Sequence, residues 1–143
     1  MAHADSTVTI RRPIGEVFAY LADGTNNQQW RAGVLEIERT SAAGGGQATY
    51  RQVLKGPGGR RIDGDYRITV YQPPAVIGFE VTAGPLRPVG RFVLAEAGRD
   101  TTTVSFSLDA RPAGLMRLMG PMITRQMHTE VARLGRLKQI LER

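Results

Sequence analysis

The feature that most constrains the fold is a change of hydrophobic period near residue 111. From Val34 to Ala110, short runs of alternating apolar and polar residues end at glycine, proline or aspartate clusters, a pattern typical of antiparallel strands. After Pro112, apolar residues recur at helical spacing over about seven turns. The stripe consists of Met116, Met119, Ile123, Met127, Val131, Leu134, Leu137 and Leu141. We therefore expect a sheet whose apolar face is covered by one long helix.

The remaining elements follow from the same patterns. The alternation predicts strands near residues 6–11, 34–41, 47–55, 60–71, 75–83, 89–96 and 101–110. A helix is expected from Pro13 to Asp23, and a very short one near residues 26–30. Gly120 and Pro121 predict a kink or break near residues 119–121 of the last helix. This order predicts an α+β fold with an antiparallel sheet, in one domain over residues 1–143 of which about 6–142 are ordered.

Composition excludes several kinds of site. The chain has no cysteine, and its two histidines, His3 and His128, lie far apart in sequence, so no metal site and no cofactor are expected. No apolar run is long enough for a membrane span, and the first residues do not resemble a signal peptide, so we expect a cytoplasmic protein.

The net charge of +6 is concentrated at the C-terminus, where residues 111–143 hold seven cations and two carboxylates. A basic helix of this kind attracts polyanions, but its cations also suit an ordinary solvated face. We expect no nucleic-acid partner and keep an anionic membrane surface as a weaker alternative.

The stretch Lys55-Gly-Pro-Gly-Gly-Arg-Arg61 has the composition of a phosphate-binding loop. Such a loop follows a strand and opens a helix, with its lysine after the glycines. Here the lysine comes first and a strand follows, so the stretch is predicted to be the tip of a β-hairpin.

Candidate ligand-binding residues are those expected to face the space between sheet and helix. Trp30 either plugs the joint before the first long strand or forms a cavity wall. The strand positions either line an apolar pocket or fill a core, and the methionines fit a pliable pocket or plain core. The candidates are Trp30, Tyr50, Gln52, Tyr66, Phe79, Phe92, Met119, Met122 and Met127.

No catalytic constellation emerges from the sequence. Glu80, Glu130 and His128 are each expected to be exposed, with the edge of the apolar stripe as the alternative for Glu130. Neither histidine has a partner for a catalytic triad. Catalysis would have to rest on a tyrosine such as Tyr50 or Tyr66, or on an inward arginine such as Arg91.

Several short motifs, in this order, resemble the START-like (SRPBCC) superfamily, in its polyketide cyclase/dehydrase and lipid-transport branch. They are Pro13-x-x-x-Val17-Phe18-x-x-Leu21-x-Asp23, Asn26 with Trp30, Gly46-x-x-x-Tyr50, Gly98-x-x-Thr101, and Pro112-x-Gly114-Leu115-Met116 leading to Leu137-x-x-x-Leu141-Glu142. The resemblance implies a helix-grip fold, in which a curved antiparallel sheet, two short helices and a long C-terminal helix enclose an apolar cavity.

The resemblance also implies binding or transport of a small hydrophobic molecule, such as a lipid, a polyketide or an aromatic compound. Some members of that family catalyse cyclisation or dehydration of polyketides, so a cyclase or dehydratase activity is an alternative, although the family has no shared catalytic motif that carries over. A third alternative, which rests on the basic last helix, is an interaction module for a membrane or nucleic acid. The Gly120-Pro121 break and the loop 84–88 would act either as a gate or as rigid connectors. The sequence leaves monomer and homodimer equally open.

Overall fold

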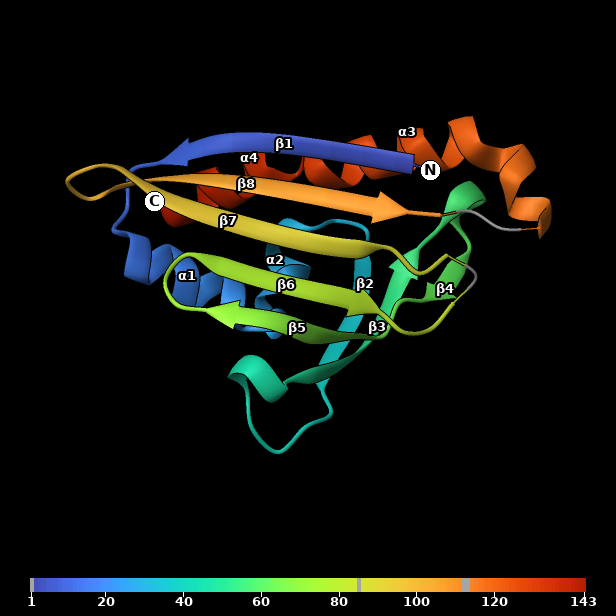
Figure 1. The fold of residues 1–143 in the computed structure, drawn as a ribbon, viewed down its shortest axis with the longest axis horizontal. Coiled ribbons are helices and arrows are strands. Elements are labelled where there is room, and N and C mark those ends of the chain that lie inside the picture. The colour runs from blue at the N-terminus through green and yellow to red at the C-terminus, as the bar shows by residue number, and fades with distance from the viewer. Residues whose placement is uncertain (1, 85, 112–113) are drawn as a thin grey trace.

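The computed structural model describes residues 2–84, 86–111 and 114–143. It shows one antiparallel sheet, two short helices after the first strand, and a segmented C-terminal helix across the sheet (Figure 1). The strands are β1 (Ala2–Ile10), β2 (Val34–Arg39), β3 (Thr49–Lys55), β4 (Arg61–Asp63), β5 (Tyr66–Gln72), β6 (Val76–Val81), β7 (Val89–Gly98) and β8 (Thr101–Ala110). The helices are α1 (Ile14–Ala22), α2 (Asn27–Trp30), α3 (Gly120–Val131) and α4 (Leu134–Leu141), with 3-10 turns η1 (Gly24–Asn26), η2 (Gly45–Gln47), η3 (Pro57–Gly59) and η4 (Gly114–Met119).

The sheet follows the order β1-β8-β7-β6-β5-β3-β2, with β4 paired to β3. Strands β1 and β2 are thus at opposite edges of the sheet. The sheet curls around the last helices, of which α3 packs on β1 and β8 and α4 packs on β1. The predicted helix-grip architecture is confirmed.

Alternation along the strands sets the core. In β8 every second residue from Thr102 to Ala110 is buried, and its neighbours are half-buried. Phe106 of β8 stacks on Phe92 of β7 with ring centroids 4.4 Å apart, and Trp30 packs edge-on against both rings. The inner face of the sheet is therefore the main apolar core.

Two predicted elements are divided in the structure. The expected strand 60–71 is broken at Gly64 and Asp65, because the Gly64 N–H donates to the Gln52 carbonyl and the Asp65 carboxylate accepts from the Gln52 N–H. The long helix breaks at Met119, as predicted, and also tightens at residues 132–135, where 3-10 hydrogen bonds replace α-helical ones. Pro121 lies in the first turn of α3, where its missing N–H costs nothing.

The first strand begins earlier than predicted, at Ala2. His3 therefore lies in β1, where its ring nitrogens contact the carboxylates of Asp109, at 2.6 Å, and Asp5, at 2.7 Å. These two contacts raise the pKa of His3. The histidine is half exposed, so it belongs to the surface of the sheet.

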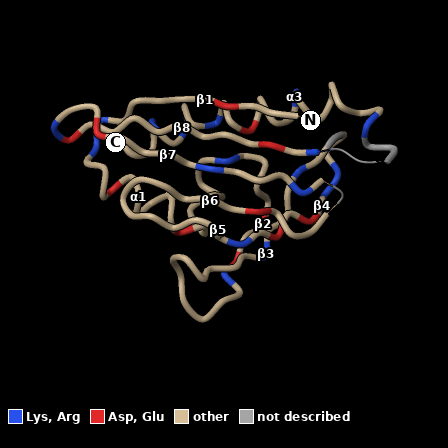
Figure 2. Tube along the Cα trace, in the orientation of Figure 1, with Lys and Arg blue, Asp and Glu red and all other residues tan. Residues whose placement is uncertain are grey.

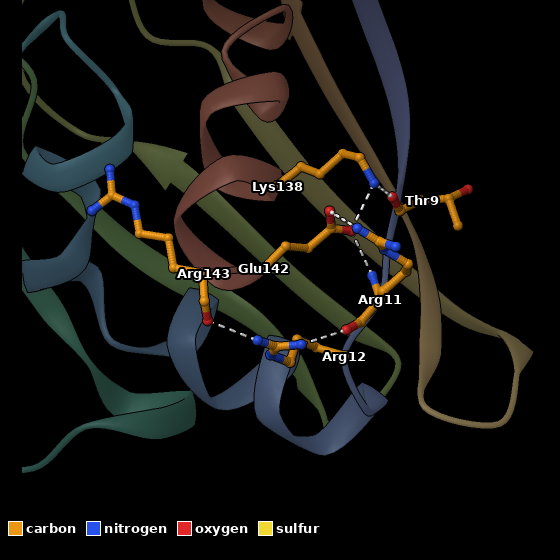
Figure 3. A network of polar contacts seen from close by, with 6 residues as sticks. All are labelled: Thr9, Arg11, Arg12, Lys138, Glu142 and Arg143. Carbon is orange, nitrogen blue, oxygen red and sulfur yellow. Dashed lines mark hydrogen bonds and ion pairs between the residues drawn. The ribbon is translucent and has the colours of Figure 1, made fainter.

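The C-terminal end of α4 is anchored to the end of β1 by a polar network (Figure 3). Lys138 donates to the Thr9 carbonyl at 2.6 Å and to the Glu142 carboxylate at 2.7 Å. The same carboxylate accepts from the Arg11 N–H at 2.8 Å, and Arg12 donates to the Arg143 carbonyl at 2.9 Å. The bonds from Lys138 and Arg11 lower the pKa of Glu142 to about 2.

Candidate functional site

A cavity of about 480 Å³ lies between the inner face of the sheet and helix α3. Its buried wall is largely apolar and comes from β3, β6, β8 and α3. The buried side chains of the lining are those of Arg31, Gln52, Phe79, Val81, Leu108, Ile123 and Met127. Because α3 supplies its buried stripe to this wall, the helix closes the cavity on the side opposite the sheet.

The position of Phe79 depends on the strand beside it. Phe79 of β6 is directly opposite Gly90 of β7, and a side chain at residue 90 would collide with the Phe79 ring. Gly90 thus provides the space in which the aromatic ring lies across the strand. Phe79 in turn contacts the Phe92 and Phe106 rings, which joins the cavity wall to the core.

An ion pair lies in the buried part of the cavity wall. The Arg31 guanidinium donates through Nε and Nη2 to Oε2 of Glu130, at 3.2 and 3.1 Å, and the side chains are only 7% and 12% exposed. Arg31 also lies 5.9 Å from the Trp30 ring and 5.8 Å from the Phe106 ring. Gly33 leaves room beside this pair, because a Cβ there would lie 2.6 Å from Oε1 of Glu130 and would displace the carboxylate.

Both Arg31 and Gln52 have unused hydrogen-bonding capacity at the cavity wall. Among the described residues, none accepts from Nη1 of Arg31. Gln52 donates through its amide nitrogen to the Gly64 carbonyl, while its Oε1 is buried without a described partner. One donor and one acceptor therefore interrupt an otherwise apolar wall.

The mouth of the cavity is formed by three segments that are distant in sequence. The β3–β4 hairpin contributes Lys55, Gly56, Arg60 and Arg61, the loop between β6 and β7 contributes Leu86 and Pro88, and η4 contributes Met119. The Lys55-to-Arg61 stretch is a hairpin tip, as predicted, with the Gly56 N–H bonded to the Arg60 carbonyl. Its cations line the cavity entrance, which its sequence did not indicate.

The predicted ligand-binding residues divide into two groups. Gln52, Phe79, Met119 and Met127 line this cavity. Trp30, Tyr50, Tyr66 and Phe92 are buried in the core beside it, and Met122, expected to face the sheet, is 50% exposed on α3. The side chain of Met116 lies outside the described residues.

Tyr50 and Tyr66 hold the short helices against the sheet. Their rings are stacked with centroids 4.9 Å apart. The Tyr50 hydroxyl accepts from the Gly24 N–H at 3.1 Å, and the Tyr66 hydroxyl accepts from Asn27 at 3.0 Å. Both hydroxyls therefore have structural partners, at η1 and α2. Burial also raises the pKa of the Tyr66 hydroxyl well above its ordinary value.

Two expectations about charged residues were wrong, and one buried arginine was not predicted. Glu130 was expected to be exposed, but its position on the inner edge of α3 puts it against Arg31. Arg91, the expected inward arginine, is exposed on β7, and the inward arginine is Arg31, which sequence reasoning missed. Its only signal was its place directly after Trp30. His128 and Glu80 are at the surface or half exposed.

Among the described residues, no group of three or more His, Cys, Asp or Glu side chains is placed to hold a metal ion. Within the same residues, no helix is both long and apolar enough to cross a membrane.

Comparison with known proteins places this cavity in context. Residues 1–142 match the family described as "Polyketide cyclase / dehydrase and lipid transport". No curated protein sequence matches the chain.

Solved structures share the fold at low sequence identity. A START superfamily protein from Mycobacterium smegmatis is 15% identical with a TM-score of 0.83, covering 99% of this chain and 98% of its own. A protein from Thermus thermophilus is 16% identical with a TM-score of 0.81, covering 96% and 94%. The Zhui aromatase/cyclase from a Streptomyces species is 20% identical with a TM-score of 0.71, covering 97% and 90%.

Proposed function

Because the chain belongs to the polyketide cyclase / dehydrase and lipid transport family, we propose that it binds a small hydrophobic molecule in the cavity between the sheet and α3. The observation that carries the proposal is the cavity itself, about 480 Å³ with an apolar buried wall. Pockets of this size and composition bury most of the surface of a small ligand. Removal of that apolar surface from water would supply most of the affinity.

The few polar groups of the wall support a ligand that is mostly apolar. Nη1 of Arg31 is available to an acceptor such as a carbonyl oxygen, and Oε1 of Gln52 to a donor such as a hydroxyl. Two such groups would fix the orientation of an apolar molecule more than they would add to its affinity.

The test is a titration with Nile red, an apolar dye whose fluorescence rises in apolar surroundings. Met127→Trp adds bulk to a buried residue of the cavity wall and should weaken dye binding at least several-fold. Met122→Trp is the matched control, since it makes the same change on the exposed face of the same helix.

The control variant should bind the dye as the unaltered protein does. Unfolding curves of both variants would show that each is folded. Equal dye binding by both variants, or no binding by the unaltered protein, would contradict a ligand in this cavity.

The second candidate function is a cyclase or dehydratase activity, favoured by the buried Arg31–Glu130 pair at the cavity wall. The Arg31 guanidinium would stabilise negative charge on a carbonyl oxygen as an enolate forms, and the Glu130 carboxylate would accept the α-proton. As the enolate re-forms the carbonyl and a C=C bond, the β C–O bond would break, and the hydroxyl would leave as water with the proton held by Glu130, which restores the carboxylate.

A β-hydroxy ketone with an aromatic ring tests this candidate. If the protein is an enzyme, Glu130→Gln should lower kcat by at least about a hundredfold. Substrate affinity, measured separately by equilibrium dialysis, should change much less. A protein that binds the ketone without turnover would be a binding protein only.

A further inference from the structure

Three apolar side chains are exposed together beside the cavity mouth. Leu118 and Met119 of η4 and Met122 of α3 are 82%, 37% and 50% exposed, and we call them the apolar tip. Met119 also lines the cavity. In Figure 1, the ribbon of η4 extends past the end of the sheet, and the three side chains are exposed on this extension and at the start of α3. Exposed apolar side chains gathered at one place mark an interaction site more often than isolated ones do.

Exposed cations lie on the segment that carries the apolar tip and on the other two segments that form the cavity mouth. Arg117 and Arg125 flank it on η4 and α3, and residues 111–129 contain no Asp or Glu. Lys55 and Arg60 are exposed on the β3–β4 hairpin across the mouth, and Arg87 is exposed on the β6–β7 loop. We call these five residues the cationic ring. Figure 2 shows lysine and arginine at the hairpin near β4 and on the segment that extends past the sheet.

Two carboxylates beside the hairpin, Glu36 and Asp63, offset only part of this positive charge. Arg61 of the hairpin forms an ion pair with Glu36 and is therefore not counted in the ring. Asp63 is the exposed carboxylate that lines the cavity. Asp109, opposite Val89 beside the β6–β7 loop, is already in contact with His3. These carboxylates thus offset only part of the charge of the five cations.

We propose that the apolar tip and the cationic ring together dock onto an anionic lipid surface. Leucine and methionine would enter the boundary between headgroups and acyl chains, while lysine and arginine would contact anionic headgroups. A projecting tip fits a partner that deforms around it, whereas a protein partner would need a matching pocket. A nucleic acid would use the cations but would gain nothing from Leu118.

This docking would place the cavity mouth against the lipid. Met119 belongs to both the apolar tip and the cavity lining, so a hydrophobic molecule could pass between membrane and cavity with little exposure to water. The docking surface goes beyond the proposed binding function, since binding within the cavity does not require a membrane.

Flotation with vesicles tests the proposal. The protein should float with vesicles of equal parts phosphatidylcholine and phosphatidylglycerol, and not with phosphatidylcholine alone. In Leu118→Ser with Met122→Ser, flotation should fall several-fold. In Arg60→Gln with Arg117→Gln, each neutralised arginine should weaken partitioning about fivefold. High salt should have a similar effect.

The matched controls are Val93→Ser, at an exposed valine of β7, and Arg99→Gln, in the turn before β8 at the far end of the sheet. Both should float as the unaltered protein does. These controls and the variant Leu118→Ser with Met122→Ser should still bind Nile red. The proposal is overturned if the protein does not float, floats equally with neutral vesicles, or loses flotation equally in the controls. Retention on polyglutamate without vesicle binding would assign this surface to an acidic protein instead.

Discussion

Arg31 and Glu130 combine a structural contact with a position at the cavity wall. Each charge loses most of its hydration, and the attraction between the two offsets this loss, so the pair adds little net stability while it is intact. Nε of Arg133 also lies 3.6 Å from Oε1 of Glu130. Removal of Glu130 leaves the Arg31 charge buried without a carboxylate partner. Helix α3 and the end of α2 therefore depend on each other through two side chains.

We predict that Glu130→Ala lowers the free energy of unfolding by about 3–5 kcal/mol, because the Arg31 charge is then buried alone. Urea denaturation measures this directly. The matched control is Glu80→Ala, which removes the carboxylate from an ion pair with Arg67 whose side chains are 42% and 58% exposed.

The control should cost about 0–1 kcal/mol, as exposed ion pairs do. Similar losses in both variants would show that the Arg31–Glu130 pair is open to water.

Single residues differ in how far the sequence could predict them. Alternation placed Gln52 and Phe79 inward, and both line the cavity. The same alternation placed Tyr50 inward, yet its hydroxyl is bonded to η1, because a face assignment does not say what a side chain meets there. Arg31 could not be predicted, since its partner is 99 residues away and no local pattern marks it.

Among the elements, the last helix is held differently at its two ends. At the C-terminal end, Glu142 joins Lys138 and the backbone of Arg11 (Figure 3). At the other end, Met119 and Met122 are exposed at the cavity mouth. A gate formed by Gly120-Pro121 and the loop 84–88 stays a prediction, although Leu86, Pro88 and Met119 lie at one mouth.

The polar network at α4 predicts a specific acid sensitivity. The folded-state pKa of Glu142 lies near 2, below its ordinary value of 4.5. Its carboxylate therefore stabilises the folded state fully above pH 4.5, and this contribution is lost as the pH falls toward 2. Urea unfolding across this range should show a shallower decline for Glu142→Gln than for the unaltered protein.

Glu96→Gln, at an exposed carboxylate of β7, serves as the control and should keep the original decline. An unchanged pH dependence in Glu142→Gln would contradict the bonds assigned to this carboxylate.

The position of Pro121 at the start of α3 predicts how its replacement affects the free energy of unfolding. Because the helix begins at Gly120, Pro121 occupies the first turn and interrupts no helical hydrogen bond. Pro121→Ala should change the free energy of unfolding by less than about 1 kcal/mol. A gain of about 3 kcal/mol, measured by urea denaturation, would instead indicate a continuous helix kinked by proline.

The sequence predicted elements best where the pattern was strong and local. The strands at 34–39 and 101–110 followed from alternation, and the break before Gly120 from proline chemistry. The division at Gly64 and Asp65 was missed because it depends on bonds to Gln52 in another strand. The tightening at residues 132–135 was missed because its residues keep helical dihedral angles and carry no proline.

At the scale of the whole molecule, the sheet and α3 leave a space that side chains do not fill. The order of elements predicted this architecture, since a curled sheet must cover the apolar stripe of the last helix. The volume of the cavity could not be predicted, because it depends on how far the sheet curves and on side chains such as Phe79 over Gly90. The central claim is that this space holds a hydrophobic ligand.

A crystal structure of the protein grown with Nile red tests that claim most directly. We expect density for the dye inside the cavity, in contact with Phe79, Ile123 and Met127. Density for the dye only at the surface, with the cavity collapsed or filled by ordered water, would contradict the claim.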